Sequence, residues 1–199
     1  MTIKLAIVYY SSTGTNYAMA RAAEREAQHR GAEVRFVRAA ELAPQEAIDA
    51  NPAWKAHVEA TRDVPVATPG DLEWADAILF STPTRYGNVA AQLKQLIDST
   101  GGLWAEGKLI DKAVSAMSSA SNPHGGQEAT ILALYTTMYH WGAIVVAPGY
   151  TDPVLFETGG NPYGASATAD MQGNFDEKVL DAVKVQTKRL LDVAAKLQR

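Results

Sequence analysis

Apolar runs and helical patterns alternate along the chain. The first apolar run, from Ile3 to Tyr10, predicts a strand. Small or apolar residues then recur with helical spacing between Ala18 and Ala27, which predicts a helix that Gly31 ends. Later apolar runs predict four more strands, and helical patterns predict three more helices. The strands are expected at 33–37, 76–81, 113–118 and 143–147, and the helices around 89–97, 131–138 and 179–197.

This alternation predicts an α/β fold with a doubly wound parallel sheet and helices on both faces. No repeat or low-complexity tract divides the chain, so we expect one domain over residues 1–199. Prolines interrupt residues 39–75, which we interpret as a long connection with one or two short helices. Residues 149–173 are rich in Gly, Pro and Asn and are expected to form a surface loop.

Composition excludes several classes of function. The formal net charge is -4, without the basic face that a nucleic-acid-binding protein normally has. The chain has no cysteine, so a disulfide, an iron–sulfur cluster and a redox thiol are excluded, and any redox chemistry needs a bound cofactor. No apolar run approaches the roughly 20 residues of a membrane span, and no signal peptide precedes the first strand. We therefore expect a cytoplasmic protein.

Candidate chemistry lies in the loop Ser11–Asn16, between the first strand and the first helix. In doubly wound sheets, ligands bind at the carboxyl ends of the strands. The free N–H groups and the dipole of a helix N-terminus favour an anion there, and four hydroxyls and an amide add donors. The loop contains no Lys or Arg, so it differs from a P-loop and suits a monophosphate. The alternative is a helix cap with additional serines.

The second loop, Thr82–Asn88, reads T-P-T-R-Y-G-N. It resembles the P-T-R-[FY]-G-N motif of tryptophan-repressor-binding-protein-type (WrbA-like) NAD(P)H:quinone oxidoreductases in the flavodoxin-like superfamily. Further matches follow in order at Thr100–Trp104, Gly125–Glu128 and Gly159–Ala165, so the resemblance covers essentially the whole chain. It implies a flavodoxin-like fold with a five-stranded parallel sheet in the order 2-1-3-4-5.

The resemblance also implies a non-covalently bound flavin mononucleotide (FMN) and a role for each motif. The FMN phosphate would bind Ser11, Ser12, Thr13, Gly14, Thr15 and Asn16. The isoalloxazine ring would lie beside Pro83, Thr84, Arg85, Tyr86, Gly87 and Asn88, and the third wall would be Ser119, Ala120, Ser121, Asn122, Pro123, His124 and Gly125. His140 and Trp104 would complete an aromatic box where nicotinamide or quinone stacks. Family members often have an aromatic residue where this chain has Thr13.

The three residues given catalytic roles have alternative interpretations. Trp104 could fill the core, and His140 could interact with the dipole at the end of its helix. Arg85 could be a surface charge, or it could stabilise the negative charge of a reduced flavin near N1. The spacing of His29, His57 and His124 does not indicate a metal site.

The resemblance predicts an FMN-dependent NAD(P)H:quinone oxidoreductase. A hydride would pass from NAD(P)H through flavin N5 to a quinone by a ping-pong scheme. The alternative is a flavodoxin-type electron carrier, although such carriers are typically more acidic. A third possibility is a binding module with a vestigial FMN site. We expect NAD(P)H and a quinone as small-molecule partners. We also expect a homodimer or homotetramer, because the loop 149–173 carries aromatic residues that suit a subunit contact.

Overall fold

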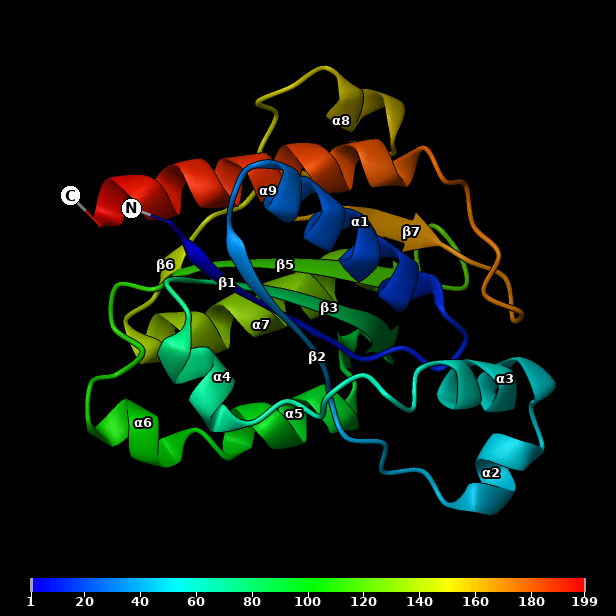
Figure 1. The fold of residues 1–199 in the computed structure, drawn as a ribbon. Coiled ribbons are helices and arrows are strands. Elements are labelled where there is room, and N and C mark those ends of the chain that lie inside the picture. The colour runs from blue at the N-terminus through cyan, green and yellow to red at the C-terminus, as the bar shows by residue number, and fades with distance from the viewer. Residues whose placement is uncertain (1, 199) are drawn as a thin grey trace.

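A central β-sheet organises the molecule (Figure 1). The computed structural model describes residues 2–198. Its main strands lie in the order β2-β1-β3-β5-β6, and all of these neighbours are parallel. In that spatial order they are β2 (Glu33–Arg38), β1 (Lys4–Tyr9), β3 (Ala77–Arg85), β5 (Ala113–Ala120) and β6 (Ile144–Val145). The predicted α/β class with a parallel central sheet is confirmed.

The strand count differs from the predicted five. Within residues 2–198 the sheet has seven strands, because β4 (Asn88–Val89) and β7 (Ser166–Thr168) join it. β4 forms an antiparallel hairpin with β3, and β7 pairs in parallel with the end of β5. The strand predicted at 143–147 is reduced to β6, which ends before Pro148 and Gly149. The order 2-1-3-4-5 therefore describes only part of this sheet.

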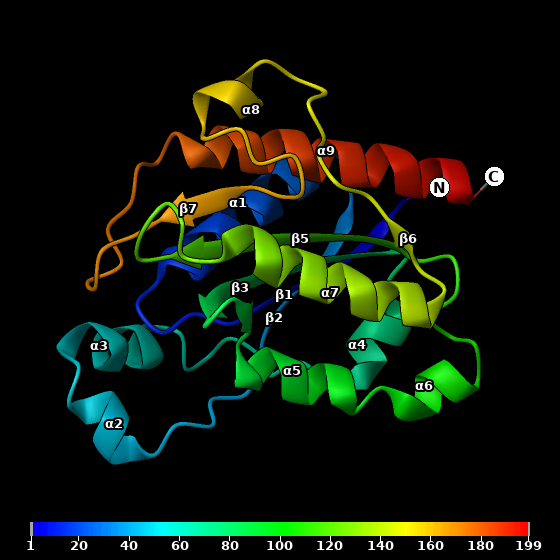
Figure 2. The same ribbon diagram turned by 180° about the vertical axis from the view of Figure 1, so that it is seen from behind.

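Helices cover both faces of the sheet (Figures 1 and 2). On one face lie α1 (Thr15–His29) and α9 (Val179–Leu197), and on the other lie α4 (Pro69–Trp74), α5 (Ala91–Asp98) and α7 (Gln127–Trp141). Successive side chains of a strand point to opposite faces, so Leu5 and Ile7 of β1 pack under α1 while Ala6 and Val8 pack on the other side. This arrangement explains why the buried strands read as continuous apolar runs.

The connection 39–75 is more helical than predicted. It contains α2 (Gln45–Asp49) and α3 (Pro52–Ala60) in addition to α4, so the expectation of one or two short helices was wrong. Thr68 and Asp71 form a capping box at the start of α4. In contrast to α4, α2 and α3 lie beyond the carboxyl edge of the sheet, beside the start of α1 (Figure 1).

The segment 149–173 is not only a surface loop. It contains the short helix α8 (Val154–Glu157), which lies outside α9, and the strand β7 (Figure 2). Buried residues Leu155, Ala165 and Ala167 anchor this excursion to the core. In the described part of the chain, no helix is long and apolar enough to cross a membrane.

Candidate functional site

A cavity of about 320 Å³ opens at the carboxyl edge of the sheet. Doubly wound sheets bind ligands at this edge, and the volume is within the range of small-molecule sites. Three of its walls come from the segments predicted to bind a cofactor. The lining residues are Ser12, Thr13, Thr15, Asn51, Trp54, Pro83, Thr84, Arg85, Ser119, Ala120, Ser121, Ala169, Asp170 and Met171.

The first wall is the loop between β1 and α1. Gly14 has a φ of 101°, which side-chain-bearing residues rarely adopt, and its N–H donates to Ser11 Oγ at 3.0 Å. Among residues 2–198 no side chain caps α1, so the N–H groups of its first turn remain available to a ligand. Ser12 and Thr13 add hydroxyls beside them. The loop fits a phosphate dianion, and the alternative that its hydroxyls cap the helix is not observed.

Two predicted phosphate ligands instead use their side chains to hold the loop in place. Asn16 is buried, its Nδ2 donates to Ser81 Oγ at 3.1 Å, and its Oδ1 accepts from Ser119 Oγ at 2.6 Å. Thr15 Oγ1 donates to the carbonyl of Gly173 at 3.1 Å. A Cβ on Gly173 would lie 2.2 Å from the carbonyl oxygen of Thr13, so only glycine allows this close approach.

The second wall is the β3–β4 hairpin. Pro83, Thr84 and Arg85 line the cavity, whereas Tyr86 and Gly87 form the tip at φ values of 54° and 78°. Thr130 Oγ1 on α7 donates to Thr84 Oγ1 at 2.8 Å, which fixes the base of the hairpin. The tip lies outside the lining, and Tyr86 is fully exposed. Thus only part of the predicted flavin-binding stretch faces the cavity, and Asn88 pairs within the hairpin.

Arg85 extends from this hairpin to the phosphate loop. Its guanidinium donates to the carbonyl of Thr84 at 3.0 Å and lies 3.4 Å from Ser12 Oγ. Arg85 is exposed, and these contacts place its charge between two walls of the cavity.

The third wall is the end of β5. Ser119, Ala120 and Ser121 line the cavity, while 122–125 form the turn that leads into α7. Gln127 Nε2 donates to the carbonyl of Asn122 at 2.9 Å and closes this turn. Asn122, Pro123, His124 and Gly125 therefore lie outside the cavity lining, contrary to the extent predicted for this wall.

Sequence reasoning missed two further walls. Asn51 and Trp54 reach the cavity from α3, and Ala169, Asp170 and Met171 reach it from the turn after β7. One local signal was present, because Asn51 followed by Pro52 is a typical helix start. Asn51 Oδ1 accepts from the N–H groups of Ala53 and Trp54 at 3.1 and 3.2 Å. The loop after β7 carries no such signal.

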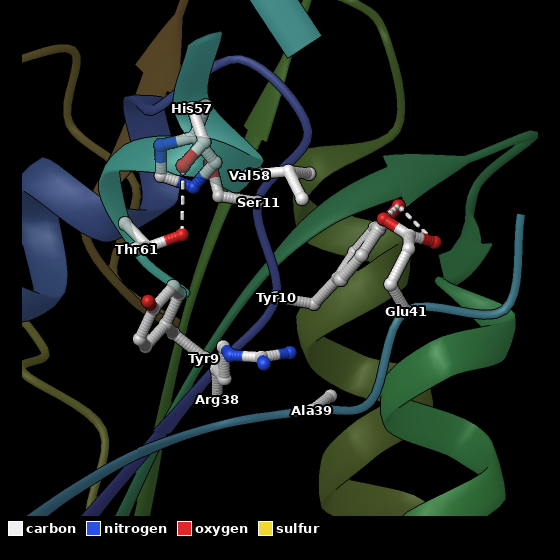
Figure 3. A pocket seen from close by; sticks show the side chains of 9 residues that line it. All are labelled: Tyr9, Tyr10, Ser11, Arg38, Ala39, Glu41, His57, Val58 and Thr61. Atoms are coloured by element: carbon white, nitrogen blue, oxygen red, sulfur yellow. Dashed lines mark hydrogen bonds between the residues drawn. The ribbon is translucent and has the colours of Figure 1, made fainter. Parts of the chain in front are cut away.

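A much smaller pocket, about 30 Å³, lies beside the phosphate loop (Figure 3). It is too small for a nucleotide, so the larger cavity is the candidate site. His57 of α3 lines it, and its Nδ1 lies 3.7 Å from the position that a Cβ on Gly14 would occupy. Burial lowers the pKa of His57 to about 4, so the imidazole is neutral at pH 7. Within residues 2–198 no cluster of His, Asp and Glu could hold a metal ion.

Residues 3–151 match the family described as NADPH-dependent FMN reductase. The chain belongs to this family. A Deinococcus radiodurans relative named NAD(P)H dehydrogenase (quinone) is 54% identical over 195 residues, which cover 98% of this chain and 97% of the relative. A Brucella abortus protein of the same name is 40% identical over 204 residues, with 98% of each chain covered. The flavodoxin, WrbA-like protein from Agrobacterium tumefaciens superposes with a TM-score of 0.67 at 21% identity, over 98% of this chain and 99% of that one. The predicted flavodoxin-like fold is thereby confirmed.

In this member of the FMN reductase family, Trp104 and His140 meet each other but not the cavity. Trp104 lies in the short helix α6 (Gly101–Ala105), and its Nε1 donates to the carbonyl of His140 at 2.9 Å. The end of α7 lies beside the start of β5, because Asp111 N–H donates to the carbonyl of Gly142. The cavity lies at the other end of β5, roughly 25 Å away at the usual rise per residue. The predicted aromatic box is thus not formed within one chain.

Exposed apolar side chains lie on the segments that meet at Trp104. Trp104 is 58% exposed, which excludes a role as core filler. Ile110, which lies near Gly142 at the end of α7, and Tyr139, next to His140 on α7, are 57% and 65% exposed. Large exposed apolar groups that lie together mark contact sites on protein surfaces. We call Trp104, Ile110 and Tyr139 the α6–α7 surface.

Proposed function

We propose that the protein is an FMN-dependent NAD(P)H:quinone oxidoreductase. The observation that carries the proposal is the cavity at the carboxyl edge, one end of which offers the N–H groups of α1 to a phosphate without a basic residue in the loop. Membership of the FMN reductase family and 54% identity to a NAD(P)H dehydrogenase (quinone) support the assignment.

FMN, held without a covalent bond, supplies the redox chemistry, since its N5 can take a hydride from NAD(P)H and its reduced form can pass two electrons to a quinone. The first turn of α1, with Ser12 and Thr13, binds the phosphate. Thr84 and the end of β5 border the ring, and the packing of the β3–β4 hairpin on α7 keeps that border rigid. Arg85 adds a positive charge that favours an anionic cofactor.

The reaction needs no protein nucleophile, so the role of the protein is to position the reactants. One cavity serves both substrates, and we propose that NAD(P)H leaves before the quinone binds. Such alternation gives parallel lines in double-reciprocal plots.

We further propose that residues 1–199 form one domain and that the active protein is a homodimer or homotetramer. Both hydrophobic clusters pack on the same sheet, which supports one domain. The α6–α7 surface supports assembly, because Trp104 and His140 can reach a cavity only if a second copy presents them. In this arrangement one copy binds the cofactor and its neighbour supplies the aromatic box.

Anaerobic stopped-flow absorbance tests the function. The protein as purified is expected to be yellow, to bleach with NADH or NADPH, and to regain its colour when benzoquinone follows. A yellow protein that bleaches with dithionite but not with either pyridine nucleotide would instead indicate the electron carrier. A colourless protein that binds no added FMN would leave only the binding module.

A further inference from the structure

Helix α3 is unusual because it contributes nothing to the core. None of the nine residues from Pro52 to Ala60 is buried, and the helix lies beyond the edge of the sheet. Its contribution to the molecule therefore lies in what its side chains contact. Asn51 and Trp54, at its first turn, line the large cavity.

Trp54 is the one aromatic side chain among the described residues that line this cavity. Its neighbours in the lining include Ser12 and Thr13 of the phosphate loop and Arg85 of the hairpin. Indole rings stack readily on flat heteroaromatic rings, and each such contact contributes substantially to binding.

A half-buried carboxylate fixes the orientation of Trp54. Glu41 Oε2 accepts from Trp54 Nε1 at 3.1 Å and from the hydroxyl of Tyr10 at 3.1 Å, the latter drawn in Figure 3. Glu41 Oε1 accepts from Gln92 Nε2 at 2.8 Å and from two backbone N–H groups, of Leu42 at 2.8 Å and Ala43 at 3.0 Å. Through Glu41 the indole is thus linked to Tyr10, which directly follows β1, and to Gln92 of α5, although its own helix lies outside the core.

The same contacts keep Glu41 charged. Burial raises the pKa of this carboxyl, but the hydrogen bonds from Ala43, Gln92, Leu42 and Trp54 outweigh burial and hold it below its ordinary value. A charged acceptor gives a stronger hydrogen bond to the indole N–H than a neutral one, so the ring is held firmly.

We propose that Trp54 forms a stacking wall for the isoalloxazine ring of FMN and that Glu41 is the positioning residue that orients it. The inference rests on the proposed function. It explains why a helix without a buried residue carries an aromatic side chain to the cavity and why a half-buried carboxylate with five donors holds the N–H of that side chain.

Titration of the apoprotein with FMN tests the proposal through tryptophan fluorescence and equilibrium dialysis. Trp54→Leu is expected to weaken FMN binding about 10-fold, the size of a lost stacking contact, and to remove part of the quenching seen in wild type. Trp74→Leu is the matched control, because Trp74 lies on α4 against Arg35, away from the cavity. It is expected to keep wild-type affinity. Trp54→Phe keeps a ring and is expected to fall between the two.

Glu41→Gln tests the positioning role by a separate readout. The variant is expected to bind one FMN per chain but to show an altered visible circular dichroism of the bound flavin, because the ring beside it is no longer fixed. An unchanged spectrum would overturn the role of Glu41.

The outcomes separate this inference from the proposed function. Wild-type affinity and full quenching in Trp54→Leu would overturn the stacking wall while leaving the FMN site intact. Quenching of Trp54 only when NADH is added to the holoprotein would also overturn it, because the ring would then face the pyridine nucleotide. Failure of the wild-type apoprotein to bind FMN would overturn the proposed function itself.

Discussion

Residues at the two ends of the loop Ser11–Asn16 have different roles. Ser12 and Thr13 face the cavity, whereas Asn16 is buried and joins the loop to β3 and β5. The same short stretch therefore binds a ligand and fixes its own position relative to the sheet. Substitutions at the two ends are expected to have separable effects.

Thr13→Glu is expected to weaken FMN binding by about 100-fold or more. The new carboxylate would face the phosphate dianion, and contact between like charges costs several kcal/mol. Equilibrium dialysis of the apoprotein measures the change. Thr2→Glu makes the same substitution at an exposed site before β1 and is expected to bind FMN as wild type does. Equal affinities in both variants would remove the loop from the site.

Asn16→Ala is expected to lower the free energy of unfolding by about 2 kcal/mol, because the buried hydroxyl of Ser119 loses its acceptor and Ser81 Oγ loses the donor Nδ2, although Ser81 still donates to the carbonyl of residue 16. Urea unfolding measures the change. Asn174→Ala is the control, since its side chain is exposed, and it is expected to cost less than about 1 kcal/mol. An Asn16→Ala protein as stable as this control would show that the buried contacts contribute nothing net.

At the scale of elements, α3 is the part of the segment 39–75 that reaches the site. It presents Trp54 to the cavity and His57 to the small pocket, where the ring lies edge-on to Tyr17 at 5.4 Å between centroids. The attachment of α3 therefore depends on polar and aromatic side chains more than on core packing. One of these side chains titrates, which makes the attachment sensitive to pH.

His57→Gln is expected to remove a part of the acid sensitivity of the fold. The pKa of His57 is about 4 in the folded state and 6.5 in its ordinary state, so the unfolded chain binds a proton that the folded one excludes. In wild type, the contribution of neutral His57 to the free energy of unfolding is complete above pH 6.5 and is lost as the pH falls towards 4. Glutamine does not titrate, so the variant lacks this loss. Urea unfolding at several pH values measures the difference.

His29→Gln is the control for this experiment, since His29 is exposed at the end of α1, and it is expected to follow the wild-type curve. Glu41, whose charge favours the protonated form of His57, is unchanged in both variants. Parallel curves for wild type and His57→Gln between pH 4 and 6.5 would contradict the prediction.

Elements that depend on local signals were predictable, and those that depend on pairing were not. Thr68, Pro69 and Asp71 indicated the start of α4 because a capping box is local. The strands β4 and β7 are two and three residues long, too short to show a period, and they exist because β3 and β5 offer them partners. Positive φ at Tyr86 was equally invisible, since glycine alone signals such a turn.

The site follows the same division. Ser12, Thr84 and Ser119 lie at strand ends, and strand ends of a parallel sheet meet at one edge, so the sequence predicted that they come together. Trp54 and Met171 reach the cavity from segments whose position depends on tertiary packing, and no periodicity reports that. Trp104 and His140 were expected at the cavity but lie at the other end of β5, because α7 runs back along the sheet.

For the whole molecule, the two ends of the sheet carry different surfaces. The carboxyl edge holds the cavity, and the opposite end holds the exposed α6–α7 surface. In the proposed assembly, copies would associate through that surface and so bring Trp104 and His140 near the cavity of a neighbouring copy. Activity is therefore expected to depend on the oligomeric state more strongly than FMN binding does.

Tyr139→Asp is expected to reduce the mass seen by light scattering from that of a dimer or tetramer, because a charge would be buried in the contact. Turnover of NAD(P)H and benzoquinone is expected to fall at least about 10-fold while FMN still binds. Leu197→Asp, an exposed apolar position on α9, is the control and is expected to keep the wild-type mass and activity. A monomeric wild type at micromolar concentration would reject the assembly.

The edge of the sheet beside β5 is interrupted, and this interruption is a place where the length of the chain can vary. β6 pairs with β5 up to Val114, and β7 resumes at Ser118, so three residues of β5 separate the two pairings. Along the chain, by contrast, twenty residues, 146–165, lie between the end of β6 at Val145 and the start of β7 at Ser166. Three residues would suffice to continue β6 into β7 as one strand, so the segment is seventeen residues longer than the pairing with β5 requires. Changes in length are expected to leave the register of the other strands unchanged when they fall in the exposed part of this segment, away from its buried residues Val146, Leu155 and Ala165.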